Sequence, residues 1–419
     1  MKHTDIIRKL NLEQKCALLS GETVFTTRAL PGRGIPSITL SDGPNGVRKQ
    51  AGAADHLGLN PSVPATCFPT SSATACSWDE ALGEAVGEAM GEEAAAQEVA
   101  VLLGPGLNIQ RSPLCGRDFE YFSEDPILAG KMAAAYVRGI QKNGISACPK
   151  HFAVNSQELR RMASDSVVDE RTLRELYLTG FEIVVKEARP KTIMTSYNLV
   201  NGTYANENAH LLQDILRKDW GFDGAVVTDW GGSNDHALGV KNGSTLEMPC
   251  PGGDSIRELM KAVKDGKATE ADLDARLDEL LELVLSTHAA VEKAPRTFDA
   301  AAHHALARRA AAESIVLLKN EDDILPLKAG EKLAVIGDFA QTPRYQGAGS
   351  SAVNALQVDA LLDCIKADDS GIAFVGYASG FDRQGAADPK KQEEAVSLAK
   401  QADTCLLYTS PSPRDAHES

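Results

Sequence analysis

Short apolar runs alternate with longer helical patterns along the first 290 residues, and this alternation narrows the fold more than any other feature of the sequence. Segments 79–99 and 168–188 carry apolar residues at helical spacing. Strands that alternate with helices indicate parallel βα units. We therefore predict an α/β protein whose residues 1–295 form a (β/α)8 TIM-type barrel, with an open doubly wound sheet as the alternative. The strand-like runs are 35–40, 99–103, 145–148, 192–196, 225–228 and 245–248.

A second α/β pattern follows a polar, proline-containing segment at 292–298. Residues 256–284 and 300–319 have helical character on either side of that segment. We predict a linker with a helix over residues 296–330 and an incomplete C-terminal α/β domain over residues 331–404. Its predicted strands are 333–337 and 372–376, and its predicted helices are 356–367 and 392–402.

The last residues, CLLYTSPSPRDAHES, do not continue this pattern. A buried apolar strand is expected after residue 403, because a parallel sheet needs both faces covered. The segment resembles the translation of an adapter used in DNA library preparation. We predict that residues 405–419 are a non-native tail and that the native sequence is truncated near residue 404; a genuine disordered tail is the alternative.

Charge and composition exclude several classes of partner. The 419-residue chain has a formal net charge of −15, which disfavours nucleic acid and anionic membrane surfaces. The N-terminal segment lacks the apolar core of a signal peptide, so we expect a soluble, cytoplasmic protein. The eight cysteines are scattered without a CxxC pair, which favours buried free thiols over a metal site.

Polar residues follow the predicted strands, and barrel enzymes place catalytic groups at those carboxyl ends. One strand end carries Glu247 in the sequence LEMP, which we interpret as structural. With that one, five strand ends carry polar residues in register with the βα pattern, and the other four define a candidate site. Its members are Asp42 and the nearby Arg48, Lys150, His151, Tyr197, Asp229 and Trp230.

The same stretches resemble glycoside hydrolase family 3, in its two-domain β-glucosidase branch. The resemblance covers residues 10–360, in family order and spacing. It rests on LSDGPNGVR, GPGLNIQRSPLCGRDFEYFSEDP, CPKHFAVNSQELRRM, MTSYNLVNG, GFDGAVVTDWGG, AAAESIVLLKNEDDILPL and YQGAGSSAVN.

The resemblance implies a retaining β-glycosidase, β-glucosidase-like, that hydrolyses terminal non-reducing β-D-glycosyl residues. Asp229 corresponds to the nucleophile, and Trp230 to an apolar wall beside the sugar. Ser350 or Ser351, on a loop of the second domain, would reach the same sugar. The residues that match positions around the sugar are Asp42, Arg48, Arg117, Lys150, His151, Arg161 and Tyr197.

In this branch the general acid/base is a Glu of the second domain, beyond the end of this chain. The chain is therefore expected to be weak or inactive on ordinary glycosides, whose leaving group needs a proton. Retaining hydrolysis needs an ionised nucleophile, and Lys150 and Arg161 would keep Asp229 ionised. Asp42 can accept two sugar hydroxyls, and a neutral polyol needs neither metal nor cofactor.

Other interpretations remain open at this point. Asp229 could cap a helix; Arg117 could pair with neighbouring acids, and His151 and Tyr197 could be core residues. A Schiff-base aldolase acting through Lys150 is one alternative. An inactive carbohydrate-binding homologue is a second, and a β-xylosidase or other glycosidase specificity is a third. The expected substrates are small oligosaccharides or aryl and alkyl β-glycosides, and the oligomeric state is not predicted.

Overall fold

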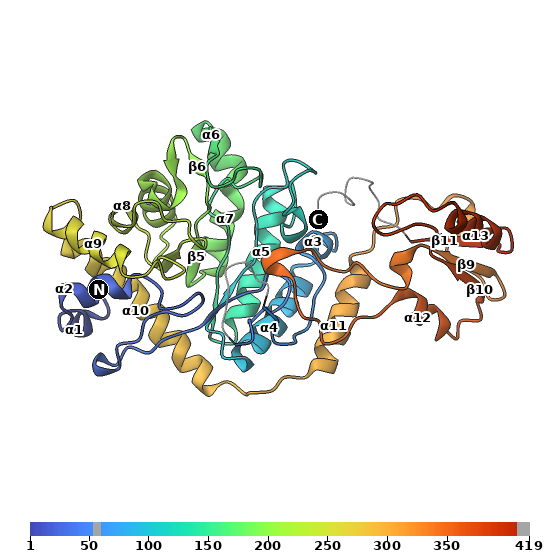
Figure 1. The fold of residues 1–419 in the computed structure, drawn as a ribbon, viewed down its shortest axis with the longest axis horizontal. Coiled ribbons are helices and arrows are strands. Elements are labelled where there is room, and N and C mark those ends of the chain that lie inside the picture. The colour runs from blue at the N-terminus through green and yellow to red at the C-terminus, as the bar shows by residue number, and fades with distance from the viewer. Residues whose placement is uncertain (53–59, 409–419) are drawn as a thin grey trace. The chain divides into compact units, whose positions relative to one another are not determined.

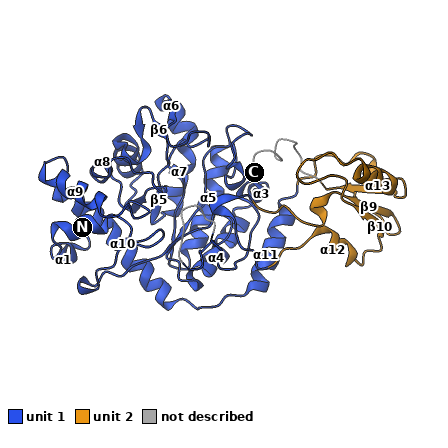
Figure 2. Cartoon of the chain, viewed as in Figure 1, with its two compact units in different colours: residues 1–315, 347–356 blue, residues 316–346, 357–419 orange. Residues whose placement is uncertain are grey.

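The computed structural model describes residues 1–52 and 60–408 (Figure 1). The chain divides into two compact units (Figure 2). Unit 1 contains residues 1–315 and 347–356, and unit 2 contains residues 316–346 and those from 357 onward. The predicted class, an α/β protein with parallel sheets in both parts, is confirmed.

Parallel strands form the centre of unit 1. Strand β1 (Leu40–Asp42) pairs with β2 (Val101–Leu103), which pairs with β3 (Ser146–Ala147). A second parallel pair is β5 (Thr192–Met194) with β8 (Ala225–Val227). Nearly every residue of these strands is buried, as continuous apolar runs covered on both faces require.

Isolated bridges connect the two sheets into a ring. Phe152 pairs in parallel with Thr195, and Val227 with Leu246. Residue 247 pairs in parallel with Ser20, and antiparallel bridges at 21–27 and 26–39 lead the chain to β1. An antiparallel hairpin, rather than further βα units, thus joins the ends of the parallel series in the described part of unit 1. The specific closure of eight βα units stays a prediction.

Helices surround these strands. The chain caps several of them with an aspartate whose carboxylate accepts backbone N–H bonds, including Asp79 before α4 and Asp125 before α5. The α-helices of unit 1 are α1 (Thr4–Ile7), α2 (Leu12–Leu18), α3 (Ser71–Ala75), α4 (Glu80–Ala96), α5 (Pro126–Gln141), α6 (Glu170–Thr172), α7 (Thr179–Ile183), α8 (His236–Asn242), α9 (Asp254–Lys264), α10 (Glu270–Lys293) and α11 (Ala300–Glu313).

Shorter elements complete unit 1. A small sheet forms from β4 (Asp165–Ser166), β6 (Leu199–Val200) and β7 (Thr203–Tyr204). π-Helical turns occur at η3 (Leu173–Tyr177), η4 (Val184–Ala188) and η6 (His210–Asp219). The 3-10 turns are η1 (Pro31–Arg33), η2 (Asp118–Glu120), η5 (Ala205–Glu207) and η9 (Gly349–Ser351).

Two helical predictions differ from the structure. The pattern over 256–284 is interrupted, because Gly266 adopts a left-handed φ of 73° and Thr269 forms a capping box that starts α10. The helix predicted over 300–319 ends at Glu313, and it packs in unit 1 rather than in a separate linker. His303 Nδ1 lies 2.8 Å from Glu93 Oε1 and anchors α11 to α4.

Unit 2 contains a parallel three-stranded sheet in the order β10–β9–β11. Its strands are β9 (Lys332–Ile336), β10 (Ala373–Ala378) and β11 (Thr404–Leu407); its α-helices are α12 (Leu361–Lys366) and α13 (Pro389–Ala399), and its 3-10 turns are η7 (Glu321–Asp323) and η8 (Asp338–Ala340). The first residues of the predicted tail thus form a strand, although Leu406 and Leu407 are exposed. Residues 409–419 lie outside the described part, so the non-native origin of the tail stays a prediction.

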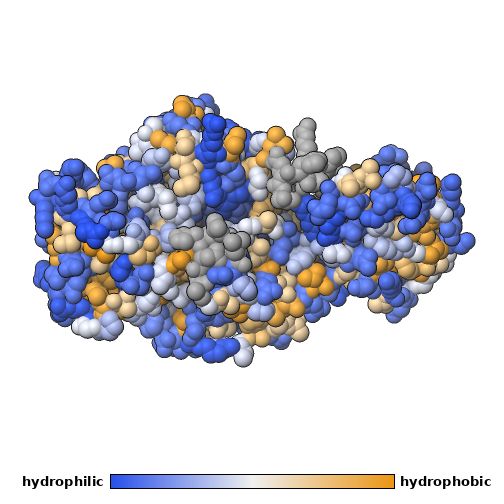
Figure 3. Space-filling model, viewed as in Figure 1, coloured by the Kyte–Doolittle hydropathy of each residue, from blue (hydrophilic) through white to orange (hydrophobic). Residues whose placement is uncertain are grey.

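The exposure of the cysteines agrees only partly with the prediction that they are buried free thiols. All eight cysteines are free, but Cys76, Cys364 and Cys405 are exposed, so the prediction of buried thiols is wrong for these three. Among the described residues, no helix combines the length and apolarity that a membrane crossing requires. On the face drawn in Figure 3, hydrophilic residues predominate and apolar residues occur in scattered patches.

The close contact between α4 and α5 predicts that a larger residue at position 87 destabilises the protein. A Cβ added at Gly87 would lie 2.9 Å from the Tyr136 Cα, because the two helix backbones touch there. We expect Gly87→Ala to lower the free energy of unfolding of unit 1 by about 1–3 kcal/mol, since overpacking outweighs the better helix propensity of alanine. Urea denaturation followed by circular dichroism measures the change.

The control is Gly32→Ala, because no atom lies within 4 Å of a Cβ at Gly32. A Gly87→Ala variant as stable as this control would show that the helices separate without cost.

Candidate active site

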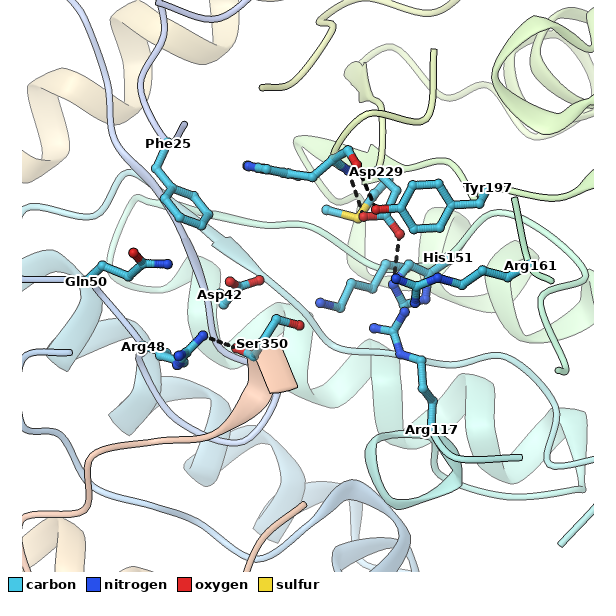
Figure 4. Close-up of a pocket in the computed structure, with 13 residues that line it drawn as sticks. Phe25, Asp42, Arg48, Gln50, Arg117, His151, Arg161, Tyr197, Asp229 and Ser350 are labelled. Carbon is cyan, nitrogen blue, oxygen red and sulfur yellow. Dashed lines mark hydrogen bonds and ion pairs between the residues drawn. The ribbon is translucent and has the colours of Figure 1, made fainter. Parts of the chain in front are cut away.

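The candidate site is a pocket in unit 1 at the carboxyl ends of its parallel strands. The space between its lining atoms is about 570 Å³, open solvent at its mouth included. Figure 4 shows Asp229, Tyr197 and the residues near them facing Phe25, Gln50 and Arg48 across the pocket. The lining residues are Phe25, Asp42, Arg48, Gln50, Arg117, Lys150, His151, Arg161, Met194, Tyr197, Asp229, Trp230 and Ser350.

Asp229 lies two residues after β8, and its two carboxylate oxygens have different surroundings. Its Oδ1 accepts a 2.7 Å hydrogen bond from the Trp230 backbone N–H, whereas its buried Oδ2 accepts none from the described residues. The Thr228 hydroxyl fixes this strand end by exchanging hydrogen bonds of 3.0 and 2.8 Å with the Met248 backbone. An oriented carboxylate oxygen is therefore available to a molecule in the pocket.

Lys150 and His151 follow β3 and are both buried. His151 Nε2 lies 3.6 Å from Asp229 Oδ2. Burial, with the charges of Arg117 and Lys150, lowers the pKa of His151 well below its usual value, so the ring is neutral. Lys150 places a cation near two carboxyls: it limits the rise in the pKa of Asp42, which lines the pocket, and helps to lower the pKa of Glu120, which lies behind it.

Two arginines come from loops rather than from strand ends. Arg117 pairs with Glu120, which is buried. Burial opposes ionisation of Glu120, but Arg117 and Lys150 outweigh it and hold the pKa of Glu120 below its usual value. Arg161 pairs with Glu158 at 2.7 Å and lies 4.6 Å from the centre of the Tyr197 ring, a cation–π distance.

Tyr197 follows β5 and donates a 2.8 Å hydrogen bond to the Trp230 carbonyl oxygen. Trp230 forms an apolar wall with Phe25, with ring centres 5.3 Å apart. The indole N–H donates a 2.7 Å hydrogen bond to the Val24 carbonyl oxygen, which fixes the ring against the N-terminal hairpin. The pocket thus combines one aromatic wall with a polar floor.

Asp42 ends β1, and the backbone N–H of Arg48 donates a 2.9 Å hydrogen bond to its carbonyl oxygen. Burial raises the pKa of the Asp42 carboxyl to about 6, although Lys150 and Arg48 counteract the rise. Asp229 and Glu120 add to it, because like charges disfavour ionisation. Asp42 is therefore an acceptor whose charge changes close to neutral pH.

Segment 347–356 brings the last lining residue to unit 1. Of the two candidates, Ser350 lines the pocket, and its carbonyl oxygen accepts a 3.5 Å hydrogen bond from Arg48. Ser351 is buried and donates to the Ala348 carbonyl oxygen at 3.1 Å. The Phe119 ring packs directly on the backbone of Gly347.

The structure brings together every residue predicted for the site, from Asp42 to Ser350, in one pocket. Glu247 lies outside it, bonded to Ser255. Sequence reasoning missed Phe25, Gln50 and Met194. The position of Met194 at the end of β5 was a usable signal, whereas Phe25 and Gln50 lie in loops without one.

Comparison with known proteins identifies relatives across the whole chain. Residues 57–283 match the glycosyl hydrolase family 3 N terminal domain, and residues 315–419 match the family's C-terminal domain. Thermostable beta-glucosidase B of Acetivibrio thermocellus is 46% identical over 96% of this chain and 53% of its own length. An exo-alpha-(1->6)-L-arabinopyranosidase of Bifidobacterium longum is 45% identical over 96% of this chain and 54% of its own.

Solved structures agree. A GH3 beta-glucosidase of Bifidobacterium adolescentis superposes with a TM-score of 0.88 at 42% identity, over 96% of this chain and 57% of that one. Beta-glucosidase 3B of Thermotoga neapolitana, solved with glucose, gives 0.83 at 35% identity over the same shares. The present chain spans about half the length of the curated relatives that it matches.

The pocket groups carboxylates, cations and an aromatic wall at the carboxyl ends of parallel strands, where α/β enzymes place their sites. With both of its domain models matched, the chain belongs to glycosyl hydrolase family 3.

The raised pKa of Asp42 predicts how the pocket's affinity for a hydroxyl-bearing ligand depends on pH, with glucose as the probe. As the pH falls through about 6, Asp42 gains a proton and loses acceptor capacity. We expect the affinity for glucose to weaken as the pH is lowered from about 7 to about 5. Titration followed by the fluorescence of Trp230 and its neighbours measures the dissociation constant.

Asp42→Asn is the control, and it should bind more weakly throughout and lose most of this pH dependence. A wild-type affinity that stays constant between these pH values would contradict the assignment.

Contact between Gly347 and Phe119 predicts a second effect on binding. A methyl group at residue 347 would overlap the Phe119 ring and displace the loop that carries Ser350. We expect Gly347→Ala to weaken glucose binding about tenfold, equivalent to ~1.4 kcal/mol. The same fluorescence titration measures it.

The double variant Gly347→Ala/Phe119→Leu should recover part of the loss, because the smaller side chain makes room. A double variant no better than Gly347→Ala would mean that this contact does not place the loop.

Proposed function

We propose that the protein is a retaining, β-glucosidase-like glycosidase that forms a covalent glycosyl-enzyme on Asp229. The observation that carries the proposal is the buried Asp229 Oδ2, which lines the pocket and accepts no hydrogen bond from the described residues. A structural aspartate at a strand end would use both oxygens on backbone or side-chain donors. An unused oxygen facing a polar cavity is what a nucleophile requires.

The proposed sugar lies against the wall formed by Trp230 and Phe25. Asp42 accepts from two of its hydroxyls, and Lys150 donates to a third. Further donors come from Arg117 and Arg161, and the His151 ring lines the pocket beside them. This arrangement suits a neutral hexopyranose, because it supplies directional partners to several hydroxyls on one face of a small ring.

In the proposed reaction, Asp229 Oδ2 attacks the anomeric carbon while the bond to the leaving oxygen breaks. The electron pair of that bond stays on the leaving oxygen, which takes a proton from a general acid. Water then attacks the same carbon, gives its proton to the conjugate base and releases Asp229 as a carboxylate.

The general acid is the part of the machinery that the described pocket does not supply. Its only lining carboxyls are Asp42 and Asp229 within residues 1–52 and 60–408. We assign both to other roles, and propose that the acid is a glutamate in the part of the relatives' length that this chain does not cover. The ring of strands in unit 1, closed through the hairpin before β1, supports a TIM-type barrel as the frame for this chemistry.

The names of two relatives suggest which sugars to compare as substrates of this protein. One relative is a beta-glucosidase and another an exo-alpha-(1->6)-L-arabinopyranosidase, at nearly the same identity. We propose a glucoside substrate, with arabinopyranosides and β-xylosides as the sugars to compare. Competition of each free sugar with glucose in the pocket ranks them.

Trapping of the nucleophile tests the proposal without a general acid. A 2-deoxy-2-fluoro-glucoside with a dinitrophenolate leaving group needs no protonation, so Asp229 should take up one fluoroglucosyl group. Intact-mass and peptide mass spectrometry locate the label. Cellobiose, whose leaving group needs a proton, should be turned over slowly by the 419-residue chain.

Asp229→Asn is the matched variant and should remain unlabelled while it still binds glucose. Label at another residue would refute the role of Asp229. Glucose binding with no label on the wild-type chain would favour a carbohydrate-binding protein without catalysis.

A further inference from the structure

The His151 ring is held at both nitrogens and along its backbone. Nδ1 lies 3.2 Å from the hydroxyl oxygen of Tyr121, and Nε2 lies 3.6 Å from Asp229 Oδ2. The side-chain amide of Asn108 accepts from the His151 N–H at 2.8 Å and donates to the His151 carbonyl oxygen at 2.9 Å. The ring is 1% exposed, so its orientation is set by these neighbours.

The Tyr121 hydroxyl donates its proton to His151 Nδ1. Tyr121 is fully buried, and burial raises its pKa well above the ordinary value, so it keeps its proton. Its ring meets the imidazole edge-on, with centres 6.2 Å apart. His151 Nδ1 is its hydrogen-bond partner among the described residues. A buried O–H is almost always donated, so the proton points at Nδ1.

The state of His151 then follows. Its ring is neutral, because burial and the cations Arg117, Lys150 and Arg161 all oppose a positive charge. A neutral imidazole carries one N–H and one lone pair. Since Nδ1 accepts from Tyr121, the N–H must be on Nε2, which faces Asp229.

The other tautomer would be unfavourable for both neighbours. It would place the Nε2 lone pair against the Asp229 carboxylate and an Nδ1–H against the Tyr121 O–H. The distance of 3.6 Å between Nε2 and Asp229 Oδ2 is longer than a hydrogen bond. The Nε2–H therefore orients the Asp229 carboxylate electrostatically and leaves the lone pairs of Oδ2 unused.

We propose that Tyr121 is a positioning residue that fixes His151 as the Nε2–H tautomer and so directs a proton at the nucleophilic oxygen of Asp229. The tautomer follows from the contacts and the burial of His151 and does not depend on the proposed function, whereas its effect on catalysis rests on the proposed function of Asp229. Neither Tyr121 nor Asn108 lines the pocket, so both act through His151.

Nitrogen NMR of the 419-residue chain labelled with ¹⁵N-histidine tests the tautomer directly. The His151 signals, identified by their loss in His151→Gln, should show a protonated Nε2 and an unprotonated Nδ1. Tyr121→Phe should convert them to a mixture of tautomers. A proton on Nδ1 in the wild-type chain, or an unchanged spectrum in Tyr121→Phe, would overturn the proposal.

Tyr136→Phe is the matched control, because Tyr136 is equally buried and its ring packs on Phe122 rather than on His151. It should leave the His151 signals unchanged. If Tyr121→Phe fails to fold, the wild-type spectrum alone still decides which nitrogen carries the proton.

The effect on chemistry is measured by the rate of labelling with the fluoroglucoside. Tyr121→Phe should slow the labelling of Asp229 by roughly ten- to a hundredfold, the cost of a misoriented group, with little change in glucose affinity. An equal rate would overturn the catalytic half of the proposal. Label away from Asp229 would instead refute the proposed function and leave the NMR result intact.

Discussion

Charge compensation at the carboxyl ends of the strands is the constraint on which the site depends. Asp42, Glu120 and Asp229 are carboxyls removed from most solvent, and each would be costly to bury alone. Lys150 and Arg48 limit the rise in the pKa of Asp42. Arg117 and Lys150 hold the pKa of Glu120 below its usual value. Removing one charge would therefore disturb the ionisation of the others, so the cluster behaves as a single electrostatic unit.

The frame around this cluster is apolar and closely packed. Short buried strands place Asp42 and Asp229 at one edge of the structure, and the N-terminal hairpin links the strand series while carrying Phe25 into the pocket. The close approach of α4 and α5 through Gly87 keeps the outer layer tight against the strands. Rigidity of this kind suits a site whose groups must hold their orientation before a sugar arrives.

Periodicity and strand-end position could be read from the sequence, and they placed Asp42, Lys150, Tyr197 and Asp229 correctly in one pocket. Arg117 and Arg161 come from loops, so only the family resemblance indicated them. Contacts between residues far apart in the sequence could not be predicted, because no local pattern indicates them. These include the choice of Ser350 over Ser351, the packing of α11 against Glu93, and the use of Tyr121 as a partner of His151.

The pocket is built from two segments of the chain that are synthesised at different times. The polypeptide leaves unit 1 after residue 315, contributes β9 to unit 2, and returns to unit 1 at 347–356 before it leaves again. On a ribosome, which makes the chain from its N-terminus, the strands around Asp229 emerge long before Ser350. Unit 1 would therefore exist for a time during synthesis with the pocket unfinished, because Ser350 is made only after β9 of unit 2.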